Sequence, residues 1–149
     1  MQYAEGSLGR VFILRLEEGD LLNDSIEKFA RKQKIVQGLA FFLGGSGGGS
    51  KVVVGPELGR ETIIPLIYAP KGPQEVLAVG TLAPNEAGEP VLHMHAAAGR
   101  EGKATVGCTR AGLEVWLVGE VVLLEILGAA GAQRRKDPET GFELLGISK

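Results

Sequence analysis

The chain has 149 residues, with 16 basic and 18 acidic side chains and a formal net charge of −2. This length favours a single domain over 1–149, and a charge this small gives no overall attraction to nucleic acid or an anionic membrane. One cysteine excludes an intramolecular disulfide. The first six residues lack a charged segment followed by an apolar run, and no apolar stretch is long enough to span a membrane. We therefore expect a cytoplasmic protein without membrane contact.

The first half of the chain predicts strands and one helix. A strand is expected at Arg10–Leu16, which is rich in β-branched and aromatic residues. A helix is expected from Leu21 to about Gln33, because apolar residues recur there with helical spacing. Those residues are Leu22, Ile26, Phe29 and Ala30. Further strands are predicted within Ile35–Leu43, Lys51–Val54 and Thr62–Tyr68.

Seven residues, Gly44–Ser50, form a glycine-rich loop between two of these strands. A phosphate-binding loop would carry Gly-Lys-Ser or Gly-Lys-Thr before a helix, whereas here the order is Gly49-Ser50-Lys51 and no helix signal follows. Nucleotide binding is therefore disfavoured. Close approach of the backbone to another subunit is an alternative use of these glycines.

The second half reads mainly as strands. They are expected at Glu75–Leu82, around the two histidines, at Ala104–Cys108 after a turn at Gly99–Gly102, at Val115–Leu127 and at Phe142–Ile147. The Val115–Leu127 run is almost continuously apolar, which predicts burial on both faces. Residues 133–137 are predicted to form a short, exposed basic loop.

The only two histidines and the only cysteine of the chain, His93, His95 and Cys108, lie within sixteen residues of one another. In a strand, residues i and i+2 point to one face at a spacing of roughly 6.5–7 Å, so both imidazoles can bind one ion. Cys108 would lie near them if the chain reverses at the glycine turn. Two imidazoles and a thiolate suit zinc and leave a fourth position for water, a small molecule or a partner's group. Alternatively, the histidines are satisfied polar groups and Cys108 is a small core residue.

The segments Gly88–His95, Val106–Cys108 and Val115–Val121 together resemble the signature of the PPC (plant and prokaryote conserved) domain. The family pattern is approximately G-x-P-x-x-H-x-H, a loop, G-G-H, and a strand with a Glu. Cys108 stands where the family has its third His, and a thiolate can replace that imidazole on zinc.

The resemblance implies an α+β domain with a mixed or largely antiparallel, curved sheet and one main amphipathic helix. It also implies a homotrimer with a binding or regulatory role through protein association. Glu75 and Glu120 match acidic positions of the family and are candidate catalytic residues, although both also fit solvated strand positions. Plant members carry AT-hook segments that bind DNA, but this chain has no Arg-Gly-Arg-Pro core, which disfavours direct nucleic-acid binding.

A more distant resemblance gives an enzyme hypothesis. Acetolactate decarboxylases are similar in building a zinc site from an H-x-H pair and a further His. By that resemblance, His93, His95 and Cys108 would hold zinc in a lyase acting on a small oxo- or hydroxy-acid. Glu75 or Glu120 would then donate the proton.

Overall fold

The computed structural model describes residues 1–58 and 63–148. Its elements are β1 (Ser7–Glu17), α1 (Leu22–Gln33), β2 (Gly38–Ser46), β3 (Val52–Pro56), β4 (Pro65–Tyr68), β5 (Gln74–Pro84), β6 (Pro90–Arg100), β7 (Lys103–Cys108), the 3₁₀ helix η1 (Thr109–Ala111), β8 (Val115–Leu127), β9 (Ala132–Lys136) and β10 (Glu143–Ile147). Thr62, where one strand was predicted to begin, lies outside the described residues.

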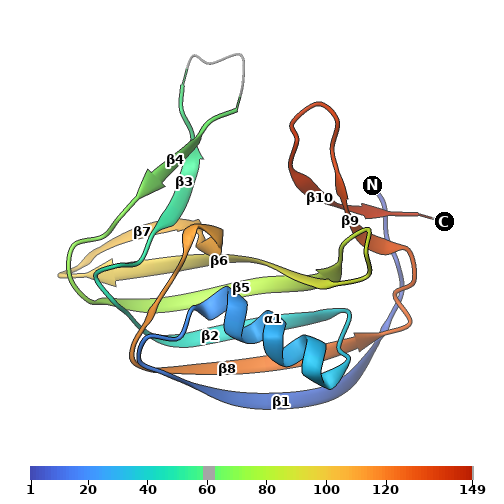
Figure 1. Cartoon of the computed structure of the whole chain (residues 1–149), viewed down its shortest axis with the longest axis horizontal. Helices are drawn as coiled ribbons and strands as arrows, with labels where there is room; N and C mark the ends of the chain where they lie inside the picture. Colours follow the sequence, from blue (N-terminus) through green and yellow to red (C-terminus); the bar gives the residue numbers. More distant parts are fainter. Residues whose placement is uncertain (59–62, 149) are drawn as a thin grey trace.

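Eight strands form one sheet in the order β1-β8-β2-β5-β6-β7-β3-β4, and every paired neighbour is antiparallel. The sheet curves around α1, and its last two strands form the β3–β4 hairpin (Figure 1). β9 and β10 form a separate two-stranded sheet. The predicted α+β fold, with a largely antiparallel curved sheet and one main helix, is confirmed.

The hydrophobic core lies between α1 and the concave face of the sheet. Leu22, Ile26 and Ala30 are fully buried on the predicted face of the helix. They pack in one cluster with sheet residues such as Phe42 and Met94. Among the described residues, no helix is long and apolar enough to cross a membrane.

The opposite face of the sheet, here called the outer face, exposes many apolar side chains. In β8 buried residues alternate with exposed or half-buried ones, so the predicted burial of Val115–Leu127 on both faces is wrong for this chain. The outer face carries Ile13, Phe41, Leu43, Leu77, Val79, Val106 and Val122, all exposed. An antiparallel strand whose second face lacks a protein layer shows this alternation.

The glycine-rich stretch is shorter as a loop than predicted, because β2 continues to Ser46. Ser50 Oγ donates to the Glu114 carbonyl oxygen at 3.3 Å and accepts from the Glu114 backbone N–H at 3.0 Å. Ser50 therefore fixes the loop against the start of β8.

A close packing contact places the histidine strand. A Cβ added to Gly80 on β5 would lie 2.5 Å from Met94 Cβ and 2.7 Å from the His93 carbonyl oxygen. Only glycine leaves room for β6 to pack at this separation. The β6–β7 turn follows at Glu101 and Gly102, which both have positive φ, as a two-residue type I′ hairpin requires.

The C-terminal residues differ from the prediction. Residues 132–136 form β9, paired with β10, and Arg134 in the middle is only 3% exposed. The predicted exposed basic loop at 133–137 is therefore wrong. Arg135 and Lys136 stay exposed, so only part of the basic run faces solvent.

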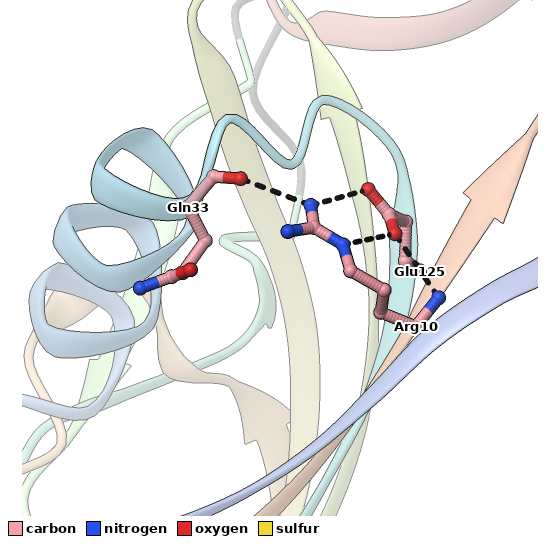
Figure 2. Close-up of polar contacts among 3 residues, drawn as sticks. All are labelled: Arg10, Gln33 and Glu125. Atoms are coloured by element: carbon pink, nitrogen blue, oxygen red, sulfur yellow. Dashed lines mark hydrogen bonds and ion pairs between the residues drawn. The ribbon is translucent and has the colours of Figure 1, made fainter.

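A second buried charge is Glu125 of β8, which meets Arg10 of β1 (Figure 2). Arg10 Nε donates to Glu125 Oε2 at 2.7 Å, and Arg10 Nη2 donates to Oε1 at 2.8 Å and to the Gln33 carbonyl oxygen at 2.9 Å. The Arg10 backbone N–H also donates to Oε2. These bonds, the side-chain ones first, lower the pKa of Glu125 to about 2. The pair joins β1, β8 and the end of α1.

Candidate metal centre

His93 and His95 lie on the outer face of β6, because Leu92, Met94 and Ala96 alternate with them into the core. In the pairing with β5, His95 lies opposite Val79 and His93 opposite Thr81. On the other side of β6, the β7 hairpin pairs Cys108 with His95. The turn at the glycines therefore brings the cysteine beside the histidines, as the sequence predicted.

The three side chains form a compact cluster. Their ligand atoms all lie within 4.8 Å of one another. The His93 and His95 Nε2 atoms are 3.2 Å apart, with the rings edge to face at 83°. Both histidines are exposed, whereas Cys108 is buried. The cluster thus lies at the surface with its sulfur on the protein side.

This geometry fits a tetrahedral metal. Zn–N bonds of about 2.0–2.1 Å would separate two imidazole nitrogens by about 3.3–3.4 Å, close to the spacing found. The same spacing also allows one neutral imidazole to donate a hydrogen bond to the other. The residues present therefore fit zinc, and the thiolate would complete the set of soft ligands that zinc prefers.

The surroundings of His93 favour its neutral form, which is the form that binds a metal. Partial burial of the ring is the main cause that lowers the pKa of His93, and the positive charge of Arg134 lowers it further. His95 and Arg110 act in the same direction. A neutral imidazole at neutral pH is the form that binds a metal.

β7 ends at Cys108 and leaves part of the edge of β6 without a neighbouring strand. Side chains of α1 and η1 bind the backbone of β6 there. Glu27 of α1 accepts from the Leu92 backbone N–H at 2.8 Å, and Asn23 donates to the Leu92 carbonyl oxygen at 3.3 Å. Thr109 of η1 donates to the Met94 carbonyl oxygen. These bonds satisfy the exposed strand edge and hold α1 and η1 next to the histidines.

Arg134 reaches the same strands from β9. Its Nε donates to the Val91 carbonyl oxygen at 3.2 Å, and its Nη2 donates to the carbonyl oxygen and Oγ1 of Thr81, at 2.8 and 3.0 Å. Burial lowers the pKa of Arg134, while Glu143 and Cys108 oppose that effect. The guanidinium remains charged, because its pKa starts far above neutrality.

A cleft of about 1070 Å³ contains the cluster. Its polar lining residues include Asn23, Asp24, Glu27, Thr81, His93, His95, Cys108, Arg110, Arg134 and Glu143. The β3–β4 and β9–β10 hairpins, which stand on either side of β6 in Figure 1, supply apolar walls. A small molecule could therefore reach the metal position from this cleft.

The two candidate catalytic carboxylates lie elsewhere. Glu75 on β5 and Glu120 on β8 are exposed, and neither lines the cleft. The structure instead brings Glu27 into the cleft, and burial is the main cause that raises its pKa. No local pattern in the sequence singles out Glu27, because its contact with Leu92 joins residues that lie 65 positions apart.

Comparison with known proteins identifies a family model that matches most of the chain. The family model of the Plants and Prokaryotes Conserved (PCC) domain, the PPC domain by another abbreviation, matches residues 3–127. No curated protein matches the chain.

Several solved structures are similar over nearly the full length. A plant- and prokaryote-conserved (PPC) protein from Pyrococcus horikoshii is 27% identical with a TM-score of 0.84, covering 100% of this chain and 99% of that one. A metal-containing protein from Archaeoglobus fulgidus is 24% identical with a TM-score of 0.82, covering 98% and 99%. A candidate DNA-binding protein from Ralstonia eutropha JMP134 is 22% identical with a TM-score of 0.70, covering 91% and 90%.

Proposed function

The chain belongs to the Plants and Prokaryotes Conserved domain family, and on that premise we propose that it is a zinc-binding assembly module. His93, His95 and Cys108 hold the ion, and the outer face of the sheet associates with further copies of the chain into a homotrimer. Its role is binding or regulation through protein association. The observation that carries the metal proposal is the cluster of three ligand atoms within 4.8 Å of one another.

The donor set indicates zinc and also sets its character. Two neutral imidazoles and one thiolate would give a bound zinc site a net charge of +1 and leave one position for a further ligand, and all three residues line the cleft. The name of the Archaeoglobus fulgidus relative, a metal-containing protein, supports a metal at this fold. When bound, zinc would act as a Lewis acid for a ligand in the cleft, and the thiolate would make it weaker than three imidazoles would.

Metal analysis tests this proposal. Protein purified without added metal is expected to contain about one zinc per chain, with an anomalous peak at the zinc edge among the three side chains. His93→Ala should lose the zinc. Val106→Ala should keep it, because Val106 is exposed and lies two residues before Cys108 without offering a ligand atom. Wild-type protein without metal above background, even after zinc is added, would refute the proposal.

The assembly proposal is supported by the apolar outer face. Leu77 and Val79, two positions apart on the same face of β5, are 64% and 49% exposed. Leu43, which pairs with Leu77 from β2, is 58% exposed. An exposed apolar surface spread over several strands is typical of an interaction site. The trimeric state itself is the one that the family resemblance implies.

Mass measurement in solution tests the assembly. Multi-angle light scattering is expected to give about three times the chain mass of 15.7 kDa. Leu77→Lys should shift the mass toward that of one chain, because a lysine cannot be buried unpaired. Val36→Lys is the matched control, since Val36 is exposed but lies between α1 and β2. A wild-type monomer would exclude the trimer.

Any DNA-related role is assigned to partner proteins. The Ralstonia eutropha relative is a candidate DNA-binding protein, but this chain has a net charge of −2 and no AT-hook core. Burial of Arg134 also leaves one cation fewer on the exposed surface of β9. Gel-shift experiments at low salt should show no direct binding, and a shift that weakens steeply with salt would contradict this assignment.

Glu27 favours a second candidate function, that of a metal-dependent lyase on a small oxo- or hydroxy-acid. Glu27 lines the cleft, and burial raises the pKa of its carboxyl group, so it keeps its proton to a higher pH than an ordinary glutamate does. A screen of such acids with zinc-loaded protein should show turnover that Glu27→Gln abolishes. Equal rates in Glu27→Gln would reject this role for Glu27, and no turnover at all would reject the lyase.

A further inference from the structure

Arg134 is a buried cation without a counter-ion. It is 3% exposed, and among the described residues no carboxylate lies within ion-pair distance of it. All of its hydrogen bonds go to neutral oxygens, those of Val91 and Thr81. Buried charges are usually paired, so this guanidinium is electrostatically incomplete.

The remaining donor of Arg134 is available to a ligand. Nε and Nη2 make the three hydrogen bonds, whereas Nη1 makes none with a described residue. Nη1 is not an enclosed atom either, since the described part of the chain has a single enclosed side-chain atom without a partner, Ser46 Oγ. Arg134 lines the cleft, so the free Nη1 can be reached from there.

The walls of the cleft are apolar. Val53, Pro56, Ile63 and Pro65 line it from the β3–β4 side, and Phe142, Leu144 and Leu145 line it from the β9–β10 side. Leu144 and Leu145 are 46% and 47% exposed, so they can still bury surface against a ligand. Arg110 lies 5.2 Å from the centre of the Phe142 ring, which places a second cation at the rim.

We propose that this cleft binds a small monocarboxylate with an apolar chain. Its carboxylate accepts from Nη1 of Arg134 and lies beside the His93, His95 and Cys108 cluster, and its apolar chain lies between the two hairpins. The inference rests on the proposed metal function in one respect, because the contact of the carboxylate with the His93, His95 and Cys108 cluster requires the bound metal. The contact with Arg134 needs no metal.

The acidic side chains of the cleft favour a ligand with a single negative charge. Asp24, Glu27 and Glu143 also line it, so the cleft has no uniformly positive field that would collect any anion. Glu27 already accepts from Leu92 and lies 3.8 Å from Arg31. A single carboxylate that reaches the guanidinium is therefore favoured over a multiply charged ligand, which the acidic side chains would repel.

Hexanoate is the probe, measured by isothermal titration calorimetry against zinc-loaded and EDTA-treated full-length protein. Hexanoate is expected to bind both forms, more tightly with zinc, and hexan-1-ol at least about tenfold more weakly than hexanoate. Arg134→Gln, which keeps a donor for Thr81, should weaken hexanoate by at least about tenfold with the zinc content unchanged. Equal binding of hexanol and hexanoate, or unchanged binding in Arg134→Gln, would overturn the inference.

The two proposals fail in different ways. If the protein holds no zinc but hexanoate binding still depends on Arg134, the metal proposal fails and this inference stands. If circular dichroism shows that Arg134→Gln does not fold, binding of hexanoate and acetate to Leu145→Ser tests the inference instead. That substitution should weaken hexanoate by about threefold and leave acetate unchanged, because only the longer chain reaches the wall. An equal effect on both acids, or on neither, would overturn the inference.

Discussion

Two buried charges of this fold, Glu125 on β8 and Arg134 on β9, differ in their partners. Glu125 is saturated, with two donors from the Arg10 side chain and one from its backbone. Arg134 is buried more deeply than Arg10, yet it meets only neutral oxygens. The first charge is completed within the chain and joins structural elements, while the second leaves a donor facing a cleft. In this fold, the buried charge without a charged partner is the one that we propose to bind a ligand, and the paired charge is structural.

The largest expected effect is the loss of zinc affinity when a proposed metal ligand next to the cleft is removed. His95→Ala should lower zinc affinity by more than about 100-fold, since even outer-shell partners of a metal site cost about 10–100-fold. Folding stability of the metal-free protein should barely change, because His95 is exposed. Competition with a zinc chelator and urea unfolding after EDTA treatment measure the two quantities. Glu125→Gln is the reciprocal control, which should keep the zinc.

Gly80→Ala should affect the region of the cleft, because it disturbs the β5–β6 strand pair that carries the histidines. The added methyl group would lie 2.5 Å from Met94 Cβ and force β5 away from β6. We expect a loss of about 1–3 kcal/mol in the free energy of unfolding, together with weaker zinc binding. Gly47→Ala is the matched control, since its nearest neighbour would be 3.6 Å away. Equal stability of the two variants would contradict the close packing.

Acid should weaken the Arg10–Glu125 region first. The pKa of Glu125 is lowered from 4.5 to about 2 in the fold, so its ionised form is stabilised by folding. That contribution is present above about pH 5 and is lost as the pH falls from about 5 to about 2. Urea unfolding across this range should show a smaller pH dependence in Glu125→Gln than in the wild type. The same pH slope in both proteins would show that Glu125 is not the group responsible.

An exposed ion pair should have the smallest effect. Arg15 Nη1 lies 3.0 Å from Glu17 Oε1, but the two side chains are 68% and 63% exposed. Solvent screens such a pair, so Arg15→Ala should change the free energy of unfolding by less than about 1 kcal/mol. Urea unfolding at neutral pH measures this. A larger loss would mean that Arg15 contributes through contacts with another subunit, since it lies on the outer face.

The sequence predicted the strands and the helix where local pattern decides them. The face of α1 and the hairpin that brings Cys108 to the histidines follow from spacing alone. It failed at β9, because a polar run such as 132–136 becomes a strand only through its pairing with β10. The roles of Glu27 and Arg134 were also missed. Both bind β6 from more than forty residues away, a distance over which local pattern carries no information.

The β9–β10 hairpin lies beyond residues 3–127, the part matched by the family model. It contributes Arg134 and one apolar wall of the cleft, while the three proposed metal ligands all come from the matched part. If both proposals hold, the metal ligands and one wall of the ligand cleft are encoded in separate stretches of the sequence. Mutation or exchange of the last two strands would then change what the cleft accepts and leave the metal ligands intact, which would give the fold a modular route to new specificities.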